Sequence, residues 1–130
     1  MNINRGLVSQ IIKNMKTKFY TFSQNNSGGS FVNSDLEGIS EYVIIEALNA
    51  ENANNRAEEI GIYFDGCDDG RDCSCCGDRW YSTNNNDGEE VPSIYGKPLE
   101  NMEKSGYRNN CFVHYLDGTF KKIEFKDKNN

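Results

Sequence analysis

ISEYVIIEA, residues 39–47, is the stretch that decides the fold. Its β-branched run at residues 43–45 is typical of a strand at the centre of a sheet. Asn49 follows in a position to cap a helix, and Gly61 is placed to end it. The small residues spaced along one face of that helix let it lie close against the sheet. They are Ala50, Ala53 and Ala57, followed by Ile60. The order of strand and then helix predicts an α+β domain.

Further strands are predicted on both sides of this unit. KTKFYTFS (residues 16–23) is rich in aromatic and β-branched residues. Residues 111–116 and 119–126 flank an Asp-Gly turn, which predicts a C-terminal β-hairpin. A short helix is expected over residues 98–104. We therefore predict an α+β fold with a mostly antiparallel sheet, packed by one main helix and joined to a Cys-rich loop.

The length of 130 residues fits one domain. We place this domain at residues 16–130 and treat residues 1–15 as an N-terminal extension. Within the extension the apolar spacing predicts a short amphipathic helix, through Leu7, Val8, Ile11 and Ile12.

The charge is unevenly distributed along the chain. The formal net charge is -6, and eight of the twenty acidic side chains but two of the fourteen basic ones lie in residues 65–90, which leaves twelve of each elsewhere. This balance argues against a nucleic-acid polymer or an anionic membrane as partner. No run is apolar and long enough for a membrane span or an export signal, so we expect a cytoplasmic protein.

Residues 65–81, DGCDDGRDCSCCGDRWY, form the segment that we name the Cys-rich loop. Its C-x-x-C pair, Cys73 and Cys76, could bind zinc together with Cys67 and with His114 from the hairpin. Cys75 is left out of this set, because the side chains of adjacent residues usually point apart. The alternative is that the cysteines are reduced and pack as small apolar residues. Zinc is thus an open possibility, and no cofactor is required.

The same loop also carries groups suited to a small molecule with phosphates and a base. Arg71 and Arg79 can form forked hydrogen bonds to phosphate, and Trp80, Tyr81 and Tyr95 offer flat faces to a purine. The arginines could instead pair with neighbouring aspartates. The remaining polar groups of this predicted site are Gln24, Asn25, Asn26, Ser27, Arg108, Asn109 and Asn110. Residues 24–29 could also be simply a turn.

A cysteine nucleophile with His114 as its base is the enzymatic alternative. Crowded aspartates oppose a thiolate, and no oxyanion hole or orienting residue can be identified. We therefore expect a protein that is not an enzyme.

Several strings together resemble a family of small phage-encoded proteins, the Thoeris anti-defence sponge proteins. The resemblance covers most of residues 16–120 and rests on two long motifs and four shorter strings. They are KFYTFSQNNSGGSF (18–31), YVIIEA (42–47), EEIGIYFDGC (58–67), GRDCSCCGDRWY (70–81), SIYGKP (93–98) and VHYLDG (113–118).

This resemblance implies a phage protein that sequesters cyclic ADP-ribose isomers in the host cytoplasm and does not degrade them. It further implies a homo-oligomer built from dimers, with a separate site for cyclic oligonucleotides in some members. A purine, two riboses and a pyrophosphate suit the aromatic, amide and arginine side chains named above. The alternative function is that of a zinc-stabilised module that inhibits a host protein through the acidic segment.

Overall fold

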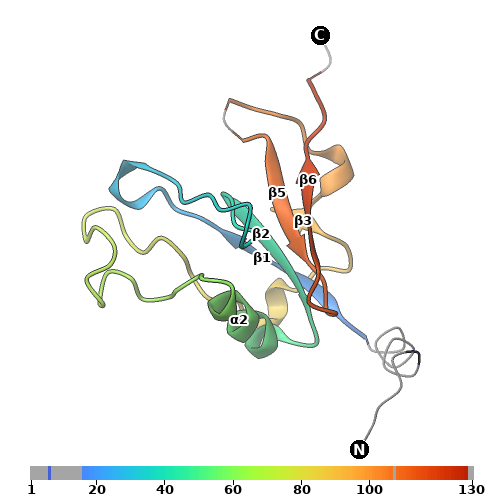
Figure 1. The fold of residues 1–130 in the computed structure, drawn as a ribbon, viewed down its shortest axis with the longest axis horizontal. Coiled ribbons are helices and arrows are strands. Elements are labelled where there is room, and N and C mark those ends of the chain that lie inside the picture. Colours follow the sequence, from blue (N-terminus) through green and yellow to red (C-terminus); the bar gives the residue numbers. More distant parts are fainter. Residues whose placement is uncertain (1–5, 7–15, 107, 129–130) are drawn as a thin grey trace, which may run out of the picture.

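A computed structural model describes residues 6, 16–106 and 108–128 (Figure 1). Its main sheet has four strands in the order β1-β2-β5-β6. They are β1 (Lys18–Ser23), β2 (Tyr42–Ala47), β5 (Asn110–His114) and β6 (Phe120–Glu124). The antiparallel pairs are β1 with β2 and β5 with β6, whereas β2 and β5 run parallel. The predicted α+β fold with its mostly antiparallel sheet and C-terminal hairpin is confirmed.

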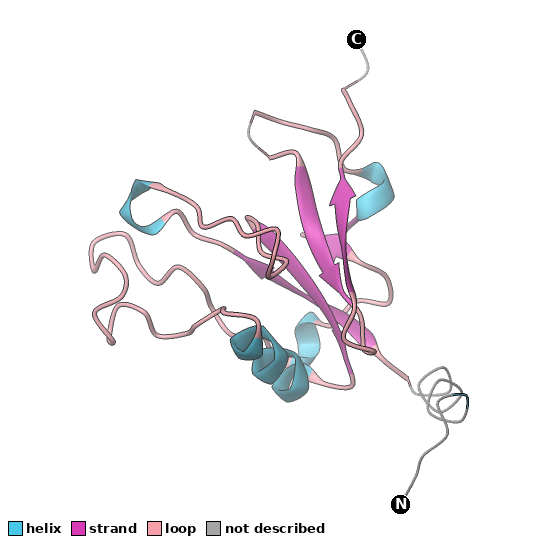
Figure 2. Cartoon of the chain, viewed as in Figure 1, coloured by secondary structure: helices cyan, strands magenta, loops and turns pink. Residues whose placement is uncertain are grey.

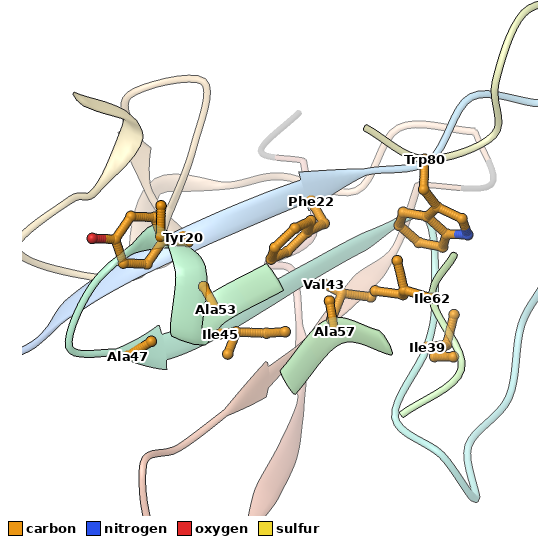
Figure 3. Packing of buried hydrophobic residues seen from close by; sticks show 11 residues of the cluster. Tyr20, Phe22, Ile39, Val43, Ile45, Ala47, Ala53, Ala57, Ile62 and Trp80 are labelled. Atoms are coloured by element: carbon orange, nitrogen blue, oxygen red, sulfur yellow. The ribbon is translucent and has the colours of Figure 1, made fainter. Parts of the chain in front are cut away.

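Strand β2 lies inside the sheet and is covered on both faces, which explains its unbroken apolar run. Tyr20, Val43 and Ile45 belong to the core cluster on one face. Ile44 and Val113 belong to a second cluster on the other face. Figure 3 shows the first cluster, in which side chains from the strands meet the alanines of the helix and the indole of Trp80.

The main helix, α2 (Ala50–Glu59), lies along β1 and β2 in Figure 2. The predicted cap is present, because the side chain of Asn49 accepts the backbone N–H of Asn52 at 2.8 Å. Ala53 and Ala57 are fully buried, so the helix approaches the sheet closely as expected. Gly61 follows the last turn with a φ of 111°, a conformation that glycine adopts without steric cost.

Short elements cover the second face of the sheet. They include β3 (Ser93–Ile94), β4 (Lys97–Pro98) and the 3-10 turn η3 (Leu99–Asn101). Two further 3-10 turns lie elsewhere in the chain, η1 (Ser27–Gly29) and η2 (Asn85–Asp87). The helix predicted over residues 98–104 was wrong beyond this one turn, because Met102 is already extended. Ile94 and Leu99 pack into the second core cluster.

The predicted helix of the N-terminal extension falls, apart from Gly6, outside the described residues. No helix among the described residues has the length and apolar character needed to cross a membrane.

Candidate functional site

The Cys-rich loop is fastened to the loop that follows β1. The side-chain amide of Asn25 donates to the carbonyl oxygens of Cys76 at 2.8 Å and Asp78 at 3.2 Å. The backbone N–H of Cys73 donates to the Oγ of Ser27 at 3.0 Å. Figure 1 shows the two loops extending side by side beyond the end of α2. Asn25 and Ser27, which were predicted to contact a ligand, therefore connect two parts of the chain.

Arg79 is the centre of this connection. Its guanidinium is nine-tenths buried and donates from Nη1 to the Oε1 of Gln24 and to the carbonyl oxygen of Ser30, both at 2.8 Å. Its Nη2 donates to the carbonyl oxygen of Ser27 at 2.8 Å, and its Nε donates to the hydroxyl of Tyr63 at 3.3 Å. The prediction that Arg79 binds phosphate is corrected, because the donors of this buried group are used within the fold.

Gln24 and Trp80 are also buried in the fold. Gln24 donates from its amide to the carbonyl oxygens of Val32 and Ser40, at 3.0 and 3.2 Å. Trp80 has an exposed fraction of 2% and belongs to the core cluster under α2. Neither presents the face or donor to solvent that a ligand would need. Their predicted ligand role is corrected for the same reason as that of Arg79.

Asp72 is the anionic partner inside the loop. Its buried carboxylate accepts the Tyr63 hydroxyl at 2.6 Å and the backbone N–H of Arg79 at 2.8 Å. Burial, and then the hydrogen bond to Asp72, raises the pKa of the Tyr63 hydroxyl. Gly66 makes room for the carboxylate, since a Cβ there would overlap an oxygen of Asp72. This aspartate therefore shapes the loop from inside.

The loop also keeps exposed groups on its outer surface. Arg71 lies over the ring of Tyr63, with its Cζ 3.9 Å from the ring centroid. Tyr81 is 59% exposed, and Asn26 is exposed at the start of η1. Of the predicted ligand residues in these two loops, these three present their side chains to solvent.

A separate pocket brings together Tyr95 and Arg108 from the predicted set. Its volume is about 490 Å³, and it lies where β3 and β4 meet residues 102–105, Arg108 and the residues after β6. It is lined by Tyr42, Ile94, Tyr95, Lys97, Met102, Glu103, Ser105, Arg108, Phe125 and Lys128. Asn109 does not line it, and its backbone carbonyl accepts the N–H of Phe125 at 2.8 Å. We name this the tyrosine pocket.

Tyr95 has an unusual backbone conformation at this pocket. With Gly96 it forms the two-residue turn between β3 and β4, and both residues have positive φ, 50° and 79°. Such a turn needs positive φ at both positions, which a tyrosine adopts only at an energetic cost. The Tyr95 ring is 83% exposed and meets the ring of Tyr42 edge to face at 6.1 Å. Strain of this kind in a pocket residue points to a functional role.

Arg108 connects the tyrosine pocket to a smaller neighbouring pocket of about 210 Å³. Its Nε lies 3.2 Å from the Oε1 of Glu41, while the Oε2 of Glu41 is buried with no hydrogen-bond partner among the described residues. Burial raises the pKa of Glu41, and the charge of Arg108 acts in the opposite direction. Asn110, named in the sequence prediction, lines this second pocket.

The thiols gather differently from the prediction. The sulfur atoms of Cys73, Cys75 and Cys76 all lie within 4.8 Å of one another, and those of Cys73 and Cys75 are 3.1 Å apart. Hydrogen bonds from Cys75 and Cys76 lower the pKa of Cys73 to about 7. This group could hold a metal ion. It includes Cys75, which sequence reasoning excluded, because the turn closed by the Cys76 N–H and the Cys73 carbonyl at 3.1 Å gathers the three thiols.

Cys67 and His114 do not belong to that group. The sulfur of Cys67 contacts the carbonyl oxygen of Cys73 at 3.5 Å, and a hydrogen bond to Asp78 raises the pKa of its thiol to about 11. His114 is fully buried in β5 and bonds through Nε2 to the carbonyl oxygen of Gly38 at 2.8 Å. The predicted ligand set of Cys67, Cys73, Cys76 and His114 is therefore corrected, because His114 is occupied in the core.

Of the aromatic and basic residues that the proposed ligand would need in the tyrosine pocket, the sequence prediction did not include Tyr42, Lys97 or Lys128. Tyr42 begins the strand that was expected only to fill the core, and its ring is 5% exposed. The sequence signal that could have located the pocket was the pair Tyr95-Gly96 between two short extended segments, since a bulky residue is unfavourable in a two-residue turn of this type. The lysines carried no signal that separated them from other surface lysines.

No curated protein and no solved structure matches this chain. Residues 17–130 match a family model described as a domain of unknown function, DUF7296. The match spans the whole sheet, α2 and both loops of the connection centred on Arg79. The chain therefore belongs to the DUF7296 family.

Proposed function

We propose that this protein binds and sequesters a nucleotide immune signal of the cyclic ADP-ribose type and does not degrade it. The observation that carries the proposal is the tyrosine pocket, where aromatic and basic side chains line one cavity. A role as a phage anti-defence protein in the host cytoplasm, assembled from dimers, follows from the resemblance of its motifs to the Thoeris sponge proteins.

The size of the pocket supports this class of ligand. Small-molecule sites commonly have volumes of about 300–1,000 Å³ and combine apolar walls with a few polar groups. The tyrosine pocket has a volume of about 490 Å³, with Ile94, Met102 and Phe125 in its walls. A pocket of this volume can bury much of the surface of a molecule that contains a purine, two riboses and a pyrophosphate.

The charges of the lining also favour an anion. Lys97, Arg108 and Lys128 line the pocket with Glu103, so basic groups outnumber acidic ones in a chain whose net charge is -6. Arg108 can present its fork to a pyrophosphate, and hydrogen bonds to charged groups are among the strongest available. The predicted phosphate contact thus moves from Arg79 to Arg108.

The aromatic groups complete the fit. Tyr42 is buried and fixed in β2, whereas Tyr95 stands exposed in its turn. A purine that enters the pocket can stack on the ring of Tyr95, which Tyr42 supports from its edge. Sequestration needs only tight binding, and nanomolar affinity corresponds to about -12 kcal/mol.

The alternative function is a zinc-stabilised module that inhibits a host protein. The three clustered cysteines of the Cys-rich loop support a metal there, but His114 does not complete the ligand set. A metal in this loop is equally compatible with a ligand in the tyrosine pocket, since the two sets share no residue. We therefore keep the small-molecule function as the main proposal.

A release assay tests the proposal. Purified protein is mixed with a cyclic ADP-ribose isomer, separated from free ligand by filtration, and heated to denature it. We expect intact ligand to be retained by the protein and returned after heating. A chemically altered product would indicate an enzyme, and an absence of uptake for every isomer would rule out the ligand class.

A further inference from the structure

The Cys-rich loop carries three cysteines whose sulfur atoms lie close together at the surface, and none of the three lines the tyrosine pocket. Cys75 and Cys76 are exposed and Cys73 is half-buried, so the group lies at the protein surface. All three are free thiols. Buried cysteines that pack as small apolar residues behave differently, as Cys111 does in β5 with no exposed surface.

The spacing of the sulfur atoms suits a single cation. Zinc binds thiolates at about 2.3 Å, which places the sulfur atoms of a tetrahedral site about 3.8 Å apart. The three sulfur atoms here lie within 4.8 Å of one another, with the Cys73 to Cys75 distance at 3.1 Å. Small rotations of exposed side chains are therefore enough to reach ligand geometry.

The backbone that carries these thiols is held in place without a metal. The N–H of Cys73 donates to Ser27, and the carbonyl oxygen of Cys76 accepts from Asn25. Gly77 follows with a φ of 87°, which turns the chain away after the last sulfur. A site whose ligands are already positioned loses little conformational entropy when it binds.

The surrounding charges favour a cation over an anion. Asp68 and Asp69 are exposed in the same loop, and residues 65–90 hold eight acidic and two basic side chains, whereas acidic and basic side chains balance in the rest of the protein. The carboxylates of Asp72 and Asp78 accept hydrogen bonds from within the loop. They add negative potential near the thiols without being needed as ligands.

We propose that Cys73, Cys75 and Cys76 bind a thiophilic divalent cation of the zinc class through three sulfur atoms, with a fourth position open to solvent. Three soft ligands and no imidazole select zinc or cadmium over magnesium or calcium. Binding releases the thiol protons to solvent and requires no oxidant. The open position distinguishes this site from a closed four-ligand structural zinc site.

The test is a titration of the reduced full-length chain with Cd²⁺ under anaerobic conditions. Binding is monitored through the thiolate-to-metal charge-transfer absorption in the ultraviolet. We expect saturation at one equivalent per chain. The affinity for Zn²⁺ is then measured by competition with a chromophoric chelator. Cys75→Ser should weaken it by about 100-fold or more, because loss of even an outer-shell partner costs up to about 100-fold.

Cys67→Ser is the matched control, since Cys67 lies in the same loop but is not one of the three clustered cysteines, Cys73, Cys75 and Cys76. It should leave the affinity for Zn²⁺ unchanged, and urea unfolding of both variants without metal should show that each is folded. If the site were instead built from Cys67, Cys73, Cys76 and His114, Cys67→Ser would weaken the affinity for Zn²⁺ and Cys75→Ser would leave it unchanged. That outcome, or a wild-type chain that gives no charge-transfer band, would overturn the proposal.

Discussion

The guanidinium of Arg79 donates to the Oε1 of Gln24 at 2.8 Å, between residues that are 55 positions apart in the sequence. This contact joins the Cys-rich loop to the end of β1. Both side chains are buried, so this hydrogen bond is shielded from water. The Cys-rich loop contains few aliphatic residues, and a buried hydrogen-bonded network holds it in place. The residues with the strongest appearance of a ligand site therefore stabilise the fold, and the tyrosine pocket becomes the candidate site.

The role of Arg79 predicts a large stability cost on its removal. Arg79→Ala leaves the buried carboxylate of Asp72 without its cation and several acceptors without a donor, so we expect a loss of about 3–5 kcal/mol. Arg79→Lys should recover little of it, since a lysine cannot reproduce the fork. Urea unfolding measures both.

Arg71→Ala is the control for Arg79, because Arg71 is exposed and lies over Tyr63. It should cost about 1 kcal/mol or less. Equal unfolding midpoints for Arg71→Ala and Arg79→Ala would show that the buried network does not stabilise the protein.

Gly38 provides a second prediction, because its surroundings leave no space for a side chain. Its φ is 75°, and a Cβ there would lie 2.7 Å from the ring of His114 and 2.8 Å from Phe120. Gly38→Ala should therefore destabilise the protein by about 2–5 kcal/mol, from backbone strain and overpacking together.

Gly28 is the matched control, since it has the same φ of 75° and a Cβ there would have no neighbouring atom within 4 Å. Gly28→Ala should cost only the backbone part, about 1–2 kcal/mol. Thermal unfolding of the two variants separates strain from crowding. If both variants lose the same stability, the packing of His114 against Gly38 is not as described.

His114 predicts a pH dependence of stability. Burial lowers its pKa below 6.5, the charge of Arg56 adds to this, and the bond to Gly38 opposes it. The unfolded chain then binds more protons than the folded chain just below pH 6.5, so stability is lost as the pH falls through this range. We expect the free energy of unfolding to be lower at about pH 5.5 than at about pH 7.5.

His114→Gln separates this contribution from that of other groups. The glutamine amide can still donate to the carbonyl oxygen of Gly38 but does not titrate. Comparing the variant with the wild-type chain cancels the effect of Glu41, whose raised pKa acts with the opposite sign. An identical pH dependence in both proteins would contradict the assignment to His114.

The strands, α2 and the hairpin were predictable because their signals are local. The β-branched run of β2, the Asn49 cap and the Asp-Gly turn each act over a few residues. The helix expected at residues 98–104 failed, because an apolar pattern of that length is compatible with a single 3-10 turn.

The candidate site was less predictable because its residues meet through tertiary contacts. Tyr42, Tyr95 and Lys128 come from three separate parts of the chain. The sequence placed arginines, aromatics and amides near one another, but it could not distinguish those that face solvent from those that pair inside. Cys75 was excluded on a general rule about adjacent side chains, which the turn at residues 73–76 overrides.

The tyrosine pocket predicts that stability and binding separate at Tyr95. Tyr95→Asn places a residue that tolerates positive φ in the strained turn, so the protein should stay at least as stable. The same change removes the stacking face and should weaken capture of the nucleotide. Thermal unfolding and isothermal titration of this variant measure the two effects. A variant that binds as tightly as the wild-type chain would exclude stacking on Tyr95.

Isothermal titration of a cyclic ADP-ribose isomer into the wild-type chain, Arg108→Ala and Arg71→Ala tests the central claim most directly. Arg108 lines the tyrosine pocket, whereas Arg71 lies on the outside of the Cys-rich loop. We expect Arg108→Ala to weaken binding about tenfold or more, the scale of a lost hydrogen bond to a charged group, and Arg71→Ala to leave it unchanged. Loss of binding in Arg71→Ala with full affinity in Arg108→Ala would contradict the account.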